Sequence, residues 1–192
     1  MSRDETATLV DRARDGSQTA LDVLYARCAA KLLPLIRQRL GPSLRSDLES
    51  RDILQAVLMK SFERRAQFHG AQAGSWMAWL ARIADNEIRD RADYRTRLRR
   101  DAARRVPLDE AADVPAPVRS ALSQTILGEA AERLERALDS LSDAYREVIL
   151  LRQFEELTFP EIAARLGKSQ DACRMAYARG MTALTLKMSE PT

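Results

Sequence analysis

The segment from residue 158 to residue 181 has the pattern of two short helices that meet at a tight glycine turn. Thr158 can cap the first helix while Glu161, three residues later, bonds back to the N–H of the cap, as in a capping box. Gly167 suits the left-handed conformation in which many helices end, and Ser169 can cap the second helix. The pattern predicts a helix-turn-helix, whose second helix enters a DNA groove by its N-terminal end.

The second helix of this pair is predicted to have an inner and an outer face. Cys173 and Tyr177 recur at a spacing of four and are expected to face inward. The residues expected to face outward, toward base edges, are Gln170, Asp171, Arg174, Met175, Ala178 and Arg179. A helical hairpin inside a bundle core would show the same apolar pattern, so the rest of the chain must decide between the two.

The remainder of the chain is typical of an all-α protein. It is rich in Ala, Leu and Arg, and only 7 of its 192 residues are glycine. Apolar residues with helical period predict helices around residues 20–40, 53–62, 76–88, 127–141 and 142–154. Signals for strands are nearly absent.

Local signals predict where these helices begin and end. Ser50, Ser75 and Ser142 are expected to act as N-caps. Pro34 is expected to kink or split the helix at residues 20–40, which should end at Gly41. The glycines at 70 and 74 predict a loop between them.

A compositional break separates two predicted helical domains. Residues 106–123 contain three prolines together with small and acidic residues, where helical periodicity is lost. We therefore expect a Pro-rich linker at 106–124 between one small helical domain at 1–105 and a second at 125–192. The second would be a four-helix domain that contains the helix-turn-helix.

Charge is distributed unevenly along the chain. The net charge is only +3, yet residues 82–105 carry nine arginines against five acidic residues. Such asymmetry suits a polyanionic partner, although a solvated helix face would show the same run.

Other features narrow the class of protein. Cys28 and Cys173 each stand at an apolar helix position, which favours buried thiols in a reducing compartment over a disulfide. No cofactor-binding motif or metal-ligand cluster is present, and the single histidine, His69, leaves no set of groups for catalysis. No signal-peptide or membrane-span pattern occurs, so we expect a cytoplasmic protein that is not an enzyme.

Three motifs stand in a specific order before the helix-turn-helix. Residues 52–56 read Asp-Ile-Leu-Gln-Ala, residues 76–86 read Trp-Met-Ala-Trp-Leu-Ala-Arg-Ile-Ala-Asp-Asn, and residues 141–152 carry a Leu-Arg-Val-Ile-Leu-Arg series. In order and spacing, with the Pro-rich break between the second and third, they resemble the motifs of bacterial RNA polymerase sigma factors of the sigma-70 class. The short extracytoplasmic-function (ECF) group is the most similar.

The resemblance implies a transcription initiation factor that binds core RNA polymerase, directs it to promoter DNA and favours strand opening. An anti-sigma protein is a further partner that it implies. The alternative is a dimeric helix-turn-helix regulator that binds a palindromic site without being a polymerase subunit.

The resemblance also implies roles for residues of the first domain. Those expected to contact the polymerase are Asp52, Gln55, Lys60 and Arg64, although Asp52 would equally stabilise the N-terminus of its own helix. Those expected at the minus-ten element are Phe68, His69, Trp76, Arg82, Asn86 and Arg89. Trp76 and Trp79 could stack on unpaired bases, but their place on the apolar stripe favours core packing.

In the second domain the resemblance places a set of residues at the minus-thirty-five element. They are Lys168, Ser169, Gln170, Asp171, Arg174, Met175, Ala178 and Arg179. Arg174 is the best candidate for bonding O6 and N7 of a guanine, while Arg165 would meet a phosphate. The chain departs from the family pattern at Ala56, where Glu is expected, at Asp171, where Gly is usual, and at Ala176, where Arg is usual.

Overall fold

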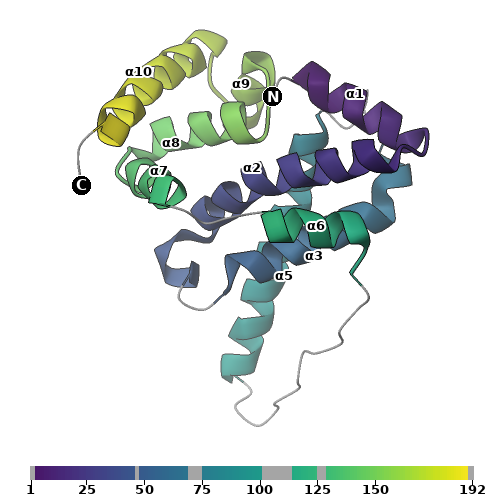
Figure 1. The fold of residues 1–192 in the computed structure, drawn as a ribbon. Helices are drawn as coiled ribbons and strands as arrows, with labels where there is room; N and C mark the ends of the chain where they lie inside the picture. Colours follow the sequence, from purple (N-terminus) through teal and green to yellow (C-terminus); the bar gives the residue numbers. More distant parts are fainter. Residues whose placement is uncertain (1–2, 46–47, 69–74, 101–113, 125–128, 190–192) are drawn as a thin grey trace.

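The computed structural model describes residues 3–45, 48–68, 75–100, 114–124 and 129–189 (Figure 1). All regular structure in these ranges is helical, which confirms the all-α prediction. The elements are α1 (Arg3–Arg14), α2 (Gln18–Arg45), α3 (Ser50–Arg64), η1 (Arg65–Gln67), α5 (Trp76–Arg100), α6 (Ala116–Gln124), α7 (Glu129–Asp139), α8 (Asp143–Ile149), η2 (Leu150–Phe154), α9 (Phe159–Leu166) and α10 (Gln170–Ser189).

The long helix α2 forms the centre of the molecule. Its predicted apolar stripe is buried and packs on α1, α3, α5 and α6. The expectation that Pro34 kinks or splits this helix is wrong, because the non-helical backbone lies at Gly41 (φ 64°). Pro34 has no N–H to bond the carbonyl of residue i−4, which is Ala30. Because Ala30 is exposed, its carbonyl can be solvated instead.

Helices α3 and α5 bury the stripes that their sequences predict. Ile53, Leu54, Val57 and Leu58 of α3 are buried, as are Leu80 and Ile83 of α5. Glu49, one residue before the predicted Ser50, is the N-cap of α3. Ser75 does cap α5, since its Oγ accepts a hydrogen bond from the Ala78 N–H at 3.0 Å. The glycine-bounded loop predicted between them falls in residues 69–74, outside the described ranges.

An aromatic cluster fills the end of the core between α2, α3 and α5. Phe68 lies edge-on to Trp76 with ring centroids 4.9 Å apart, and Trp76 is 4.7 Å from Trp79. Tyr25 contacts both Trp76 and Phe62. The interpretation of the two tryptophans as core residues is confirmed.

Helix α6 corrects the expectation of a structureless Pro-rich linker. Residues 116–124 are helical, and Val118 and Ala121 are fully buried against α2 and α3. Pro117 falls in the first turn, where its missing N–H leaves no bond unmade. Residues 106–113 lie outside the described ranges.

The helix-turn-helix forms as predicted. Thr158 and Glu161 make the reciprocal bonds of a capping box, and Gly167 ends α9 in the left-handed conformation (φ 63°). Ser169 Oγ accepts from the Ala172 N–H at 3.2 Å at the start of α10. Cys173 is fully buried, so the orientation of α10 about its axis is fixed. Ser142 is the N-cap residue of α8, without a side-chain bond.

Two units pack against each other: an N-terminal unit of α1 to α6 and a C-terminal unit of α7 to α10 (Figure 1). Leu138, Ile149 and Leu150 of the C-terminal unit join the core built on α2. Ala78 of α5 in turn joins the core of the helix-turn-helix. The described residues therefore form one body in this conformation.

Candidate nucleic-acid interface

The N-terminal half of α10 presents the predicted DNA-reading residues to solvent. All eight are exposed: Lys168, Ser169, Gln170, Asp171, Arg174, Met175, Ala178 and Arg179. Met175 is a large apolar side chain that is 54% exposed. Because Cys173 and Tyr177 hold the opposite face against the core, these side chains share one accessible surface, which we call the α10 surface.

Arg174 is partly oriented by its neighbours. Its Nη1 donates to Asp171 Oδ1 at 3.2 Å, and its guanidinium carbon lies 5.7 Å from the centre of the Phe159 ring. Phe159 is in turn held edge-on against Tyr177 at 5.7 Å. Asp171, which departs from the family pattern, thus accepts a hydrogen bond from the candidate guanine-reading residue.

A second exposed surface runs along α5. Arg82, Asn86 and Arg89 are exposed, and their spacing of four and three residues places them on one side of the helix. Asn86 Oδ1 accepts from Arg89 Nη1 at 3.3 Å. We call these three residues the α5 stripe. Alternating arginines with an amide side chain suit contact with phosphates and with base edges.

Phe68 and Trp76 do not belong to this surface. Both are only 4% exposed, so neither ring offers a free face to a base in this conformation. Their predicted role at the minus-ten element is not supported, because the aromatic cluster occupies their faces. His69 lies outside the described residues.

The four predicted polymerase-contacting residues of α3 do not form one face. Asp52 and Gln55 are exposed and are separated by about 60° around the helix, whereas Arg64 lies about 180° from Gln55. Lys60 is engaged within the molecule, since its Nζ lies 2.5 Å from Glu87 Oε2. Asp52 and Gln55 are therefore the pair that one partner surface can contact together.

Burial and ion pairing shift the pKa values of titratable groups in the N-terminal core. Burial raises the pKa of the Cys28 thiol to about 12. Burial also acts to raise the pKa of Glu87, but hydrogen bonds from Lys60 and Arg91 outweigh it and hold that pKa below its usual value. Cys28 and Cys173 are both buried free thiols, as predicted.

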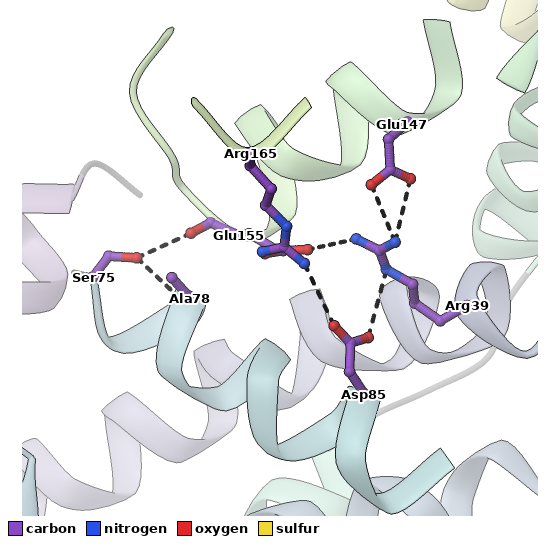
Figure 2. Close-up of polar contacts among 7 residues, drawn as sticks. All are labelled: Arg39, Ser75, Ala78, Asp85, Glu147, Glu155 and Arg165. Carbon is purple, nitrogen blue, oxygen red and sulfur yellow. Dashed lines mark hydrogen bonds and ion pairs between the residues drawn. The ribbon is translucent and has the colours of Figure 1, made fainter. Parts of the chain in front are cut away.

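Charged side chains form a contact between the two units that the sequence did not predict. Figure 2 shows Arg39 of α2 and Asp85 of α5 meeting Glu147, Glu155 and Arg165 of the C-terminal unit. Arg165, predicted to meet a phosphate, here pairs with Glu155 at 2.7 Å. One signal in the sequence could have indicated this contact. Residues 155 and 156 are both acidic and follow an apolar helix, and this acidic pair has no evident partner in the sequence.

The described part of the chain shows neither a metal-binding cluster nor a membrane-spanning helix. No three His, Cys, Asp or Glu side chains in those ranges gather so as to hold a metal ion. None of the helices there combines the length and the apolar character needed to cross a bilayer.

Known proteins resemble this chain over most of its length. Residues 131–184 match the family described as sigma-70, region 4. RNA polymerase sigma factor CarQ of Myxococcus xanthus is 28% identical over 181 residues, which cover 94% of this chain and 96% of that protein. ECF RNA polymerase sigma factor SigK of Mycobacterium sp. (strain KMS) is 29% identical over 165 residues, 86% of this chain and 81% of that protein.

Among solved structures, the sigma factor RpoE in complex with the anti-sigma factor NepR from Bartonella quintana is 19% identical. The alignment covers 94% of this chain and 99% of that chain, with a TM-score of 0.45.

The fold and the α10 surface define the class: an all-α, helix-turn-helix DNA-binding protein. Residues 131–184 thus match sigma-70 region 4, and over most of its length the chain is similar to RNA polymerase sigma factors, including proteins of the ECF group. It is accordingly a transcription initiation factor.

Proposed function

We propose that this chain binds core RNA polymerase in the cytoplasm and directs it to promoters by reading two DNA elements. The observation that carries the proposal is the α10 surface, on which all eight predicted residues are exposed while Cys173 anchors the opposite face. The predicted domains at 1–105 and 125–192 each contribute one DNA-contacting surface. Helix α6 belongs to the first of them by its packing.

The α10 surface is assigned to the minus-thirty-five element. Arg174 would bond O6 and N7 of a guanine in the major groove. Asp171 holds the Arg174 guanidinium in the free protein and could accept a hydrogen bond from a cytosine amino group when DNA replaces that contact. Lys168 at the start of α10 is placed to meet a phosphate, which fits the positive end of the helix dipole.

The α5 stripe is assigned to the minus-ten element. Arg82 and Arg89 would contact phosphates on either side of Asn86, whose amide can bond a base edge. Binding unpaired bases better than paired ones would favour the open state of the duplex. This assignment rests on exposure and spacing along one helix face.

Asp52 and Gln55 are assigned to the polymerase contact. Both side chains are exposed on α3. An anti-sigma protein is a further proposed partner, by analogy with the relative solved with NepR.

The test is a pull-down of the full chain with bacterial core RNA polymerase, followed by run-off transcription from a genomic promoter library. We expect a stoichiometric complex and discrete new start sites. Replacing Asp52 and Gln55 together by Ala should weaken the complex, whereas the control Leu186→Ala, an exposed residue on the last part of α10, should not.

The alternative, a dimeric regulator, predicts a different result. The chain would then elute as a dimer and bind a palindromic site in the absence of polymerase. That pair of results, with no polymerase complex, would reject the sigma-factor role.

A further inference from the structure

A cavity lies beside the aromatic cluster, at the end of the N-terminal unit where α1 is joined to α2 (Figure 1). Its volume is about 600 Å³, within the range of about 300–1,000 Å³ that is typical of small-molecule sites. The described residues that line it come from α1, α2, the end of α3, η1 and the first position of α5. None of them belongs to the α10 surface or to the α5 stripe, so the cavity has no part in the DNA contacts proposed above.

The floor of the cavity is apolar. Val10 of α1, Leu21 and Leu24 of α2 and Trp76 of α5 line it, and all four are buried. Phe68 packs edge-on against Trp76, which fixes the indole ring where it meets the cavity. A floor of aliphatic side chains and one indole ring favours the apolar part of a ligand, since water gains little from contact with it.

The rim of the cavity carries charged side chains. Arg14, Glu63 and Arg65 line it, and all three are exposed. Arg14 Nη2 donates to the carbonyl oxygen of Phe68 at 2.9 Å. Arg65 Nη1 donates to the carbonyl oxygen of Phe62, and its guanidinium carbon lies 4.1 Å from the centre of the Phe62 ring. Both guanidinium groups are therefore held in place by bonds to the backbone.

These two arginines keep hydrogen-bond donors for a ligand. Within the described ranges neither Arg14 nor Arg65 pairs with a carboxylate, and a guanidinium group has five N–H donors. Arginine suits carboxylates in particular, because the planar group can bond both carboxylate oxygens. Two positive charges and the negative charge of Glu63 leave one positive charge at the rim, which a ligand with a single negative charge would balance.

We propose that this cavity, which we call the α1 pocket, is a binding site for a small monocarboxylate with an apolar body. The apolar body would lie against the floor formed by Val10, Leu21 and Leu24, and the carboxylate would accept hydrogen bonds from Arg14 and Arg65 at the rim. The inference does not depend on the proposed function, because the α1 pocket shares no described residue with the surfaces assigned to DNA.

The chain carries its own reporter for this site. Its only two tryptophans are Trp76, which lines the α1 pocket, and Trp79, whose ring centroid lies 4.7 Å from that of Trp76. The experiment titrates the full chain with sodium octanoate and follows tryptophan emission, with calorimetry as a second measurement. The comparison probes are 1-octanol and octylammonium, which have the same apolar chain with a neutral and a positive head group.

We expect octanoate to bind saturably, one molecule per chain, and about 10-fold more tightly than 1-octanol, because charged hydrogen bonds at an exposed rim are only partly screened. Octylammonium should bind more weakly than either probe, since its charge has the same sign as the rim. Equal affinities for octanoate and 1-octanol would overturn the proposal, and so would the absence of a saturable change with octanoate.

A double variant tests the rim. Arg14→Gln with Arg65→Gln should weaken octanoate binding by about 10-fold and leave 1-octanol binding unchanged. The matched control is Arg12→Gln with Arg136→Gln, which removes two exposed arginines that do not line the cavity and should leave both affinities unchanged. Wild-type affinity for octanoate in the folded rim variant would overturn the assignment of the carboxylate to these arginines.

A second pair of variants tests the cavity itself. Ala13 lines the α1 pocket and is partly exposed, so Ala13→Phe should fill the space and abolish the binding of octanoate. The control Ala7→Phe adds the same ring at an exposed position of α1 outside the cavity. Circular dichroism verifies that each variant is folded, and the rim variant decides alone if Ala13→Phe is not. Undiminished binding by folded Ala13→Phe would place the ligand elsewhere and overturn the proposal.

Discussion

The pKa values of two buried glutamates of this protein are shifted in opposite directions. Glu87 receives hydrogen bonds from Lys60 and Arg91, and its pKa is lowered despite burial. Glu155 is buried more deeply, and burial raises its pKa although Arg165 and Arg39 act in the other direction. The same residue type therefore has a lowered pKa within the N-terminal core and a raised pKa at the contact between the two units.

Glu87 predicts a loss of stability in acid. Because its pKa is lower in the folded chain than in the unfolded chain, its contribution is present at neutral pH and is lost as pH falls through the ordinary Glu value of about 4.3 and below. Glu87→Gln should lower the free energy of unfolding at pH 7 by about 1–3 kcal/mol. It should also flatten the decline between neutral and acidic pH, as measured by urea denaturation at several pH values. An unchanged acid slope would show that other carboxylates control it.

Arg174 predicts a loss of promoter recognition without a loss of polymerase binding. Arg174→Ala should weaken binding of the polymerase complex to its promoter by about 1–3 kcal/mol, because a bidentate guanine contact is removed. Competition binding at fixed salt measures this effect, and substituting the contacted base pair should remove the difference between variant and wild type. A uniform loss over all sequences would instead assign Arg174 to a phosphate.

At the scale of elements, packing between helices decides what local signals leave open. Helix α2 continues through Pro34 because its apolar stripe is buried on several sides. Helix α6 forms in a Pro-rich segment because α2 and α3 bury Val118 and Ala121. Tertiary burial outweighs weak local propensity in both cases.

The crossing of α10 and α8 predicts a strict requirement for a small residue at Gly180. A Cβ there would lie 3.0 Å from Ile149 Cδ1 and 3.1 Å from Tyr145 Cβ. Gly180→Leu should therefore destabilise the C-terminal unit by about 1–3 kcal/mol through overpacking. Thermal denaturation measures the change, with Thr182→Leu on the exposed face of α10 as the matched control. Equal melting temperatures for the two variants would contradict the close approach.

At the scale of the whole molecule, a shared core and the ion pairs around it join the two units. Residues of α7 and α8 belong to the core built on α2, and charged pairs surround that contact. The α10 surface nevertheless stays exposed in this arrangement.

The shared core of the two units also predicts cooperative unfolding. The wild-type chain should unfold in a single calorimetric transition, because the units stabilise each other. The double variant Arg39→Gln with Glu155→Gln should show two transitions as the units become independent. Differential scanning calorimetry distinguishes the two, and two transitions in the wild-type chain would indicate that the interface contributes little.

The sequence by itself determined the helices other than α1 and α6, most of their caps and the outward face of α10. The capping box at Thr158, the turn at Gly167 and the burial of Cys173 are set by neighbours within a few residues, and so is the exposure of Arg82, Asn86 and Arg89. Such features depend on helical period and on local hydrogen bonds, which can be read from the order of residues.

Only the tertiary structure decided that α6 is part of the core, that Phe68 and Trp76 are closed off by aromatic neighbours, and that Glu155 joins the two units. Arg39 and Glu155 are 116 residues apart, so no local pattern links them. Their pairing exists because α2 and the helix-turn-helix are packed together, and the energy of a buried charge depends on which partners surround it in space.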